Sequence, residues 1–135
     1  MRLVVDTNEL FSFFNKASKA RELSLLSELD LHSPLFSINE LKEHKSEILK
    51  KFSLSETQFT LIEKLLHIVV NFSKEKEYSS FIQEAKKISP DPDDIDFFAL
   101  ALKFDCSIWS EDKLLKQQDK VKVYSTSELL KEIGL

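Results

Sequence analysis

The chain has 135 residues, 42% of them hydrophobic, and a formal net charge of −4, which is the size and composition of one domain spanning residues 1–135 with a single sizeable core. Its longest uninterrupted apolar run, residues 97–102, is far shorter than the roughly 18 to 20 residues that span a bilayer. Asp6 also interrupts the N-terminal apolar run too early for a secretory signal, and Cys106 is the only cysteine, which excludes an intrachain disulfide. We therefore expect a cytoplasmic protein with no membrane segment.

In the first half of the chain, short apolar runs alternate with longer helical patterns. Two serines have capping-box spacing to a later Glu or Gln, Ser37 with Glu40 and Ser55 with Gln58, and each pair predicts the start of a helix. The predicted elements are a strand over 3–5, helices over 9–14 and 19–29, a brief strand at 35–36, helices over 37–52 and 55–66, and a strand over 67–71.

The second half continues this alternation. Its predicted elements are a helix over 79–88, an ordered loop over 89–93, a helix over 94–104, a strand over 107–109, a helix over 113–117, a strand over 121–124 and a helix over 127–133. One glycine and three prolines leave little room for a flexible linker. The order of elements is typical of an α/β domain, so we predict a three-layer α/β/α sandwich with a central, mainly parallel sheet.

Two aspartates lie just beyond predicted strands. Asp6 follows the first strand directly, and Asp112 lies three residues after Trp109. In a parallel sheet the carboxyl ends of the strands face one crevice, where ligands collect, so both side chains are candidates for a shared site. Each is also a favoured N-cap residue for the segment that follows, and this alternative stays open.

The helix predicted over 94–104 separates two further acids. Asp94 points toward the apolar sector of that helix, whereas Asp96 lies on the opposite side. A helix-start role for Asp94 is the alternative. Periodicity does not select Glu40, because it lies off the apolar stripe of its helix and its capping-box position offers a complete structural role. On the residue pattern alone, Glu43 or Glu47 fits an acidic site equally well.

Four segments in order resemble the successive motifs of PIN-domain proteins: residues 4–10 (VVDTNEL), 37–41 (SINEL), 91–102 (DPDDIDFFALAL) and 108–113 (IWSEDK). The resemblance covers essentially the whole chain and is closest to small prokaryotic PIN proteins. It implies a PIN-like fold and a metal-dependent ribonuclease that hydrolyses single-stranded RNA, as do the toxin components of many toxin–antitoxin pairs. The acids it implies are Asp6, Glu40, Asp94 and Asp112, supported by Asn8 and Ser110, with Asp96 as an extra acid that acts through water.

By the same resemblance the cofactor is Mg²⁺ or Mn²⁺, and the partners are single-stranded RNA, an antitoxin protein and a second copy of the chain in a homodimer. Asp6, Asp94 and Asp112 are the expected metal ligands, and Glu40 is expected to orient or deprotonate the attacking water. A departure from the family pattern is the pair Glu9 and Glu111, which is expected to add negative charge near the rim of the site.

Lysines predominate among the basic residues. The densest basic face lies on the predicted helix over 37–52, where it either contacts RNA or is simply solvated, and consists of Lys42, Lys45, Lys50 and Lys51. The alternative function is a catalytically weak or inactive PIN scaffold that binds RNA or a protein partner.

Overall fold

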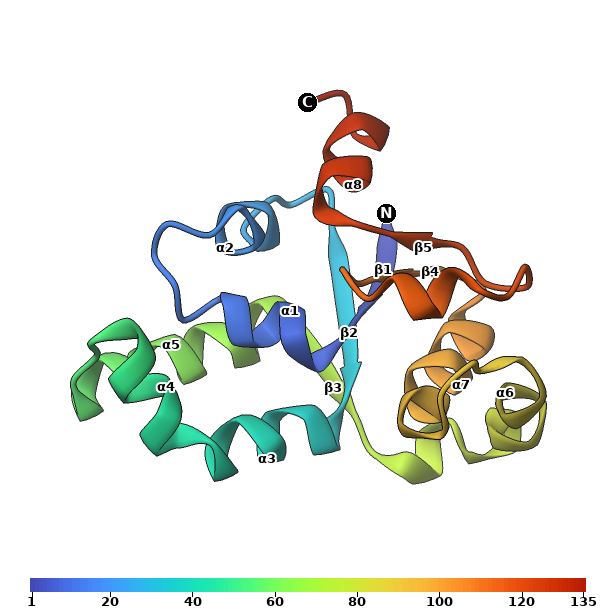
Figure 1. Cartoon of the computed structure of the whole chain (residues 1–135), viewed down its shortest axis with the longest axis horizontal. Coiled ribbons are helices and arrows are strands. Elements are labelled where there is room, and N and C mark those ends of the chain that lie inside the picture. The colour runs from blue at the N-terminus through green and yellow to red at the C-terminus, as the bar shows by residue number, and fades with distance from the viewer.

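Five short strands form the centre of the molecule (Figure 1). The computed structural model describes residues 1–135, and its strands are β1 (Arg2–Val5), β2 (Asp30–Pro34), β3 (Val70–Ser73), β4 (Ser107–Trp109) and β5 (Val123–Tyr124). They pair in the order β3-β2-β1-β4-β5, and every pair is parallel. The predicted α/β class with a mainly parallel sheet is confirmed.

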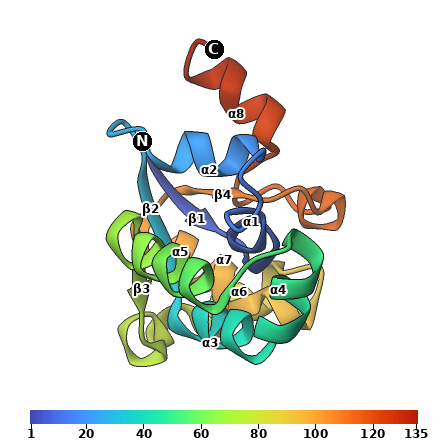
Figure 2. The same cartoon turned by 90° about the vertical axis from the view of Figure 1, so that its left-hand side faces the viewer.

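Helices cover both faces of this sheet (Figures 1 and 2). The first layer contains α1 (Thr7–Ser12), α2 (Lys19–Ser24), α3 (Leu35–Glu43), α4 (Lys45–Phe52), α5 (Glu56–Val69) and α8 (Thr126–Glu132), and the second contains α6 (Ile82–Ile88) and α7 (Ile95–Phe104). The two faces of β1 separate the two cores, because successive strand residues point to opposite sides: Leu3 and Val5 pack in one cluster and Val4 in the other. The three-layer prediction is therefore confirmed.

The prediction for residues 35–52 is wrong in three ways. The second strand is β2, which ends at Pro34, and residues 35–36 already belong to α3. The helix begins after Pro34, so Ser37 lies inside it, fully buried, and does not cap it. The helix also does not run unbroken to Phe52, because it is interrupted at His44 and continues as α4. The strand was missed because the sequence of β2, DLHSP, is polar and contains a proline.

Elsewhere the differences lie mainly at element boundaries. The apolar residues 68–70 suggested a strand, but α5 continues through Val69 and β3 begins at Val70, because Phe59 and Leu66 pack the helix into the core. The helix predicted over 113–117 is a 3₁₀ turn at Lys113–Lys116. Another 3₁₀ turn, Pro92–Asp94, precedes α7. No helix combines the length and apolar composition that crossing a bilayer requires.

Candidate metal and active site

A cleft of about 460 Å³ opens where β1 ends, next to the ends of its neighbours β2 and β4. Here the chain order reverses, because β2 and β3 lie on one side of β1 whereas β4 and β5 lie on the other, and such switch points are where α/β sheets bind ligands. The lining contains five carboxylates and no lysine or arginine. It consists of Asp6, Thr7, Asn8, Phe36, Glu40, Asp93, Asp94, Phe97 and Asp112.

Asp6 is held rigidly at the floor of this cleft. It is 5% exposed and caps α1, since its Oδ1 accepts a hydrogen bond from the Glu9 backbone N–H at 2.9 Å. Its Oδ2 accepts a hydrogen bond from the Ser110 hydroxyl. Burial raises the pKa of Asp6, although these two hydrogen bonds oppose the increase by stabilising the carboxylate. The side chain is therefore fixed in place at a cost in desolvation.

Ser110 connects the first and last of the acidic motifs. Its buried hydroxyl donates to Asp6 and accepts a hydrogen bond from the Asp112 backbone N–H at 3.0 Å. The Asp112 Oδ1 in turn accepts from the Leu114 N–H at 3.0 Å, which caps the following 3₁₀ turn. Both aspartates thus do cap the next segment, as the alternative predicted, and both also line the cleft, because capping leaves oxygen lone pairs free.

Asp94 has no capping function. It occupies the N-cap position of α7, but its side chain makes no capping hydrogen bond. Burial raises its pKa to about 6, helped by the negative charges of Asp91, Asp112, Asp6 and Asp93. The Asp94 carboxylate therefore lies free in a field of like charge, which is the electrostatic condition that a bound cation would relieve.

Glu40 and Asn8 lie at the rim of the same cleft, and both are exposed. Asp96 lies elsewhere. It lines a neighbouring hollow of about 220 Å³ and accepts a hydrogen bond from the Tyr78 hydroxyl at 2.6 Å. Folding thus brings Asp6, Glu40, Asp94 and Asp112 to one cleft and places Asp96 outside it.

A model of the PIN domain family matches residues 4–133. The chain belongs to the PIN domain family. In structure, this PIN domain is similar to a chain from the crystal structure of VapBC2 from Rickettsia felis bound to a DNA fragment from their promoter, with a TM-score of 0.62 and 14% sequence identity over 93% of this chain and 98% of that chain. At this identity the likeness concerns the fold. No curated protein matches the sequence significantly.

Sequence reasoning missed three features of the PIN domain cleft. Asp93, which the sequence places in the ordered loop over 89–93, adds a fifth carboxylate to the cleft. Phe36 and Phe97 form an apolar side of the cleft, with ring centroids 5.5 Å apart in an edge-to-face arrangement. Phe36 was expected in a brief strand and Phe97 in the apolar sector of a helix, so no sequence signal separated them from phenylalanines of the core.

The third missed feature is a chain of buried hydroxyls behind the cleft. The Ser37 Oγ accepts a hydrogen bond from Thr7 at 3.3 Å and lies 3.2 Å from the Ser33 Oγ, which donates to the Val5 carbonyl at 2.9 Å. These contacts fix the start of α3 against the end of β1, and α3 presents Glu40 to the cleft. The Ser37 hydroxyl has this role in place of the predicted cap.

The expectation for Glu9 is wrong. Glu9 is 3% exposed, and burial next to Asp6 and Glu111 raises its pKa to about 8, so its carboxyl is mostly protonated at neutral pH. It therefore adds no full negative charge at the rim. Glu111 is exposed, and its Oε1 accepts a hydrogen bond from the Thr126 backbone N–H at 2.6 Å.

The donors of the PIN domain cleft fit a hard divalent cation in their chemistry. Carboxylate oxygens are the preferred protein ligands of Mg²⁺, which usually retains several waters and needs only one or two direct carboxylates. As the side chains stand, no group of three or more His, Cys, Asp or Glu is spaced to hold a metal ion. An ion bound here would therefore need these side chains to move closer together or water to complete its coordination.

Proposed function

We propose that this PIN domain is a metal-dependent endoribonuclease that hydrolyses phosphodiester bonds of single-stranded RNA. The observation that carries the proposal is the convergence of Asp6, Glu40 and Asp94 with Asp112 on one cleft at the switch point of the sheet. Membership of the PIN domain family, whose members are typically nucleases, supports the same chemistry. The three other main hollows have at most two carboxylates each.

In this proposal Asp6, Asp94 and Asp112 hold Mg²⁺ or Mn²⁺. When bound, the cation supplies charge stabilisation for the phosphate and a water of lowered pKa. Glu40, which is exposed at the rim, orients the attacking water and accepts its proton. Ser110 keeps the Asp6 carboxylate aimed at the cleft through its hydrogen bond, and Asn8 contacts the phosphate at the opening.

The charge of the cleft explains why a cation is required. Five carboxylates without a neighbouring lysine or arginine repel an RNA phosphate. Burial is the main cause of the raised pKa values of Asp6 and Asp94, and repulsion between neighbouring carboxylates adds to it. Bound divalent cations offset most of this negative charge, so metal and RNA binding are coupled.

Asp94→Asn tests this proposal most directly, because the Asp94 carboxylate has no capping hydrogen bond to lose. With Mn²⁺ or Mg²⁺, the wild-type protein should cut single-stranded RNA and stop when a chelator is added. The variant should lose about 100-fold or more of this activity, whereas the exposed Asp119→Asn control should retain it. Cleavage by Asp94→Asn at the wild-type rate would refute the assignment.

The alternative function is a catalytically weak or inactive scaffold that binds RNA or a protein. The observation in its favour is that no three potential ligands are spaced to hold an ion as the side chains stand. Calorimetry separates the two functions. A scaffold binds RNA with an affinity that does not depend on Mn²⁺ and shows no turnover, whereas the nuclease binds RNA more tightly with Mn²⁺ and cleaves it.

The family resemblance also predicts an antitoxin partner and a homodimer, and both stay predictions. A toxin differs from a housekeeping nuclease in its physiological role and not in its chemistry. A small DNA-binding protein encoded next to this chain would favour the toxin role.

A further inference from the structure

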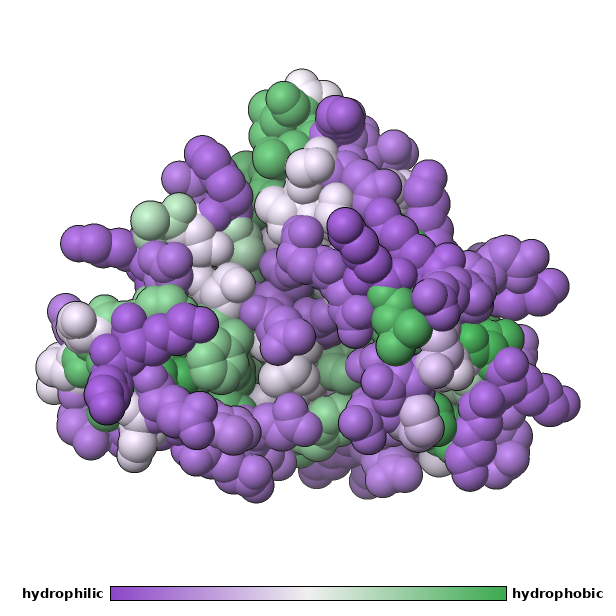
Figure 3. All heavy atoms as spheres, viewed as in Figure 1, coloured by the Kyte–Doolittle hydropathy of each residue, from purple (hydrophilic) through white to green (hydrophobic).

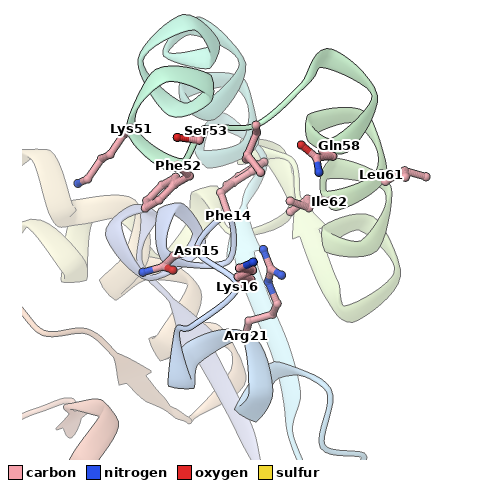
Figure 4. A pocket seen from close by; sticks show the side chains of 11 residues that line it. Phe14, Asn15, Lys16, Arg21, Lys51, Phe52, Ser53, Gln58, Leu61 and Ile62 are labelled. Atoms are coloured by element: carbon pink, nitrogen blue, oxygen red, sulfur yellow. The ribbon is translucent and has the colours of Figure 1, made fainter.

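The cleft lined by Asp6, Glu40, Asp93, Asp94 and Asp112 is called the carboxylate cleft below. A second hollow, of about 680 Å³, lies beyond the opposite end of α1 (Figure 4). We call it the basic hollow, because its charged lining residues are Lys16, Arg21 and Lys51 and no carboxylate lines it. It is formed by the turn after α1 and by α2, α4 and α5, and nearly half of its lining is hydrophobic. On the face shown in Figure 3, apolar side chains emerge among hydrophilic ones over α4 and α5.

The three cations of the basic hollow lack carboxylate partners. None of them forms a salt bridge, although other lysines do, for example Lys45 with Glu56. The Arg21 Nε donates to the Phe13 carbonyl at 2.6 Å, which anchors the side chain and leaves its terminal nitrogens free. The Lys51 Nζ lies 5.5 Å from the centre of the Phe52 ring. Cations without counter-ions in a hollow, of which Arg21 is held in place by a hydrogen bond, suit an anionic ligand.

One face of α1 connects the basic hollow to the carboxylate cleft. Asn8, Phe11 and Ser12 share one face of α1, and Asn15 lies just beyond the helix; each of the four is exposed or half-exposed. Asn8 lines the cleft and Asn15 lines the basic hollow. At a helical rise of 1.5 Å per residue, Asn8 and Ser12 are about 6 Å apart along α1, and Asn15 follows Ser12 by three residues, so a few nucleotides of extended strand can bridge the two hollows. Phe11 continues the surface by packing against Phe52, with ring centroids 6.5 Å apart.

We propose that the basic hollow binds a phosphate and the adjoining sugar of the RNA strand, a few nucleotides away from the bond cut in the carboxylate cleft. This inference rests on the proposed nuclease function. Lys16 and Arg21, whose charged ends lie near each other in Figure 4, neutralise the phosphate, Lys51 adds positive charge at the edge of the hollow beside Phe52, and the half-exposed Phe52 and the exposed Leu61 contact the sugar. The hollow thus supplies the attraction for RNA that the carboxylate cleft lacks.

One observation favours RNA over other anionic ligands, and a second indicates which part of the RNA the hollow contacts. An acidic peptide would also satisfy the cations and apolar residues, but the continuous exposed face of α1 leading to the carboxylate cleft favours the substrate strand. Phe14 is stacked on Phe59 with centroids 4.9 Å apart and is 1% exposed, so its ring offers no free face to a base. The hollow therefore contacts the strand through its backbone, without reading sequence.

The test compares a Lys16→Gln/Lys51→Gln double variant with a Lys86→Gln/Lys87→Gln double variant, which removes the same charge from the exposed side of α6. Binding of a labelled single-stranded RNA is measured in chelator, where no cleavage occurs. Loss of the two contacts should weaken binding about tenfold. It should also reduce the slope of log K against log salt by about 1.4, whereas the control should match the wild type.

Cleavage kinetics with Mn²⁺ supply the second measurement. The Lys16→Gln/Lys51→Gln variant should raise KM for a long RNA and leave kcat unchanged, and it should leave KM unchanged for an RNA too short to reach the hollow. Equal RNA affinity of the two double variants would overturn the inference while leaving the nuclease function intact. Conversely, RNA binding that depends on Lys16 and Lys51 without any cleavage would remove the nuclease function and keep the binding site.

An acidic peptide that contains leucines tests whether a protein partner, and not RNA, occupies the basic hollow. The inference is overturned if the peptide binds the wild type but not the Lys16→Gln/Lys51→Gln variant, while the two proteins bind RNA with equal affinity. The basic hollow then belongs to a protein partner. If the peptide binds neither protein and RNA affinity falls as stated, the assignment to RNA is supported.

Discussion

Glu9 is the least expected residue of the site, because a carboxyl group is buried beside the Asp6 carboxylate. Its pKa of about 8 in the folded chain lies above the ordinary value of 4.5. The folded state therefore binds this proton more tightly than the unfolded state does. The contribution of Glu9 to stability is fully present below pH 4.5 and is lost as pH rises toward 8, where the buried group ionises.

Glu9→Gln should therefore stabilise the metal-free protein at alkaline pH. We expect a gain in the free energy of unfolding of roughly 2 to 4 kcal/mol at pH 8 and little change at pH 4.5, because the amide keeps the shape of the protonated acid. Urea unfolding in chelator at the two pH values measures the gain. An equal gain at both pH values, or the same gain for the exposed Glu84→Gln, would contradict the assigned burial effect.

At the scale of elements, two identical sequence signals have different outcomes. Ser55 and Gln58 form a true capping box, since the Ser55 Oγ accepts from the Gln58 N–H at 3.1 Å and the Gln58 Oε1 accepts from the Ser55 N–H at 2.8 Å. Ser37, with the same spacing to Glu40, lies within α3 and bonds to other buried hydroxyls. The chain reaches Ser55 from a left-handed residue at Ser53, which ends α4 and leaves Ser55 extended and free to cap.

Ser55→Ala should lower the free energy of unfolding by about 1 kcal/mol, the usual cost of losing an N-cap hydrogen bond. Thermal or urea unfolding measures this loss, and the cleavage rate at saturating RNA should stay unchanged because Ser55 does not line the carboxylate cleft. The matched control is Ser127→Ala, whose exposed hydroxyl follows the true cap of α8 at Ser125. Equal destabilisation by both substitutions would show that the cap of α5 contributes nothing specific.

At the scale of the whole molecule, the carboxylate cleft links the two ends of the chain. Ser110 and Asp6 are 104 positions apart and share a hydrogen bond, because β4 pairs directly with β1. Asp94 reaches the same cleft from the second helical layer. A cation bound here contacts segments that come together only in the folded chain, so its binding energy stabilises the entire fold.

Mn²⁺ should therefore raise the Tm of the wild type by about 10 °C at a concentration near 100 times its Kd. The shift should be larger at pH 7.5 than at pH 5.5, since the Asp94 carboxyl, with a pKa of about 6, must lose its proton to bind a cation. Differential scanning fluorimetry of the wild type and of Asp94→Asn measures the effect. A shift of the same size in the variant would place the ion elsewhere.

The accuracy of the sequence prediction differs from residue to residue for physical reasons. The strand at 107–109 and the start of α5 were predicted correctly, because an apolar run and a capping box are local signals. β2 was missed, because pairing between β1 and β3 maintains a strand whose own residues are polar. The burial of Glu9 could not be predicted, since it depends on packing around Asp6 and Glu111, which are distant in sequence.

The sequence by itself determined the α/β class and the alternation of helices and strands, because these depend on hydrophobic period, capping residues and local spacing. The family was indicated by the resemblance of its four acidic motifs to those of PIN-domain proteins. Only the tertiary structure decided which acids share a cleft. The helical period already placed Asp94 and Asp96 on opposite sides, but only the folded chain brings Asp94 to the carboxylate cleft and Asp96 to the Tyr78 hydroxyl. The tertiary structure also formed the basic hollow from four separate segments, since the strand order brings α1, α2, α4 and α5 together on one face of the sheet.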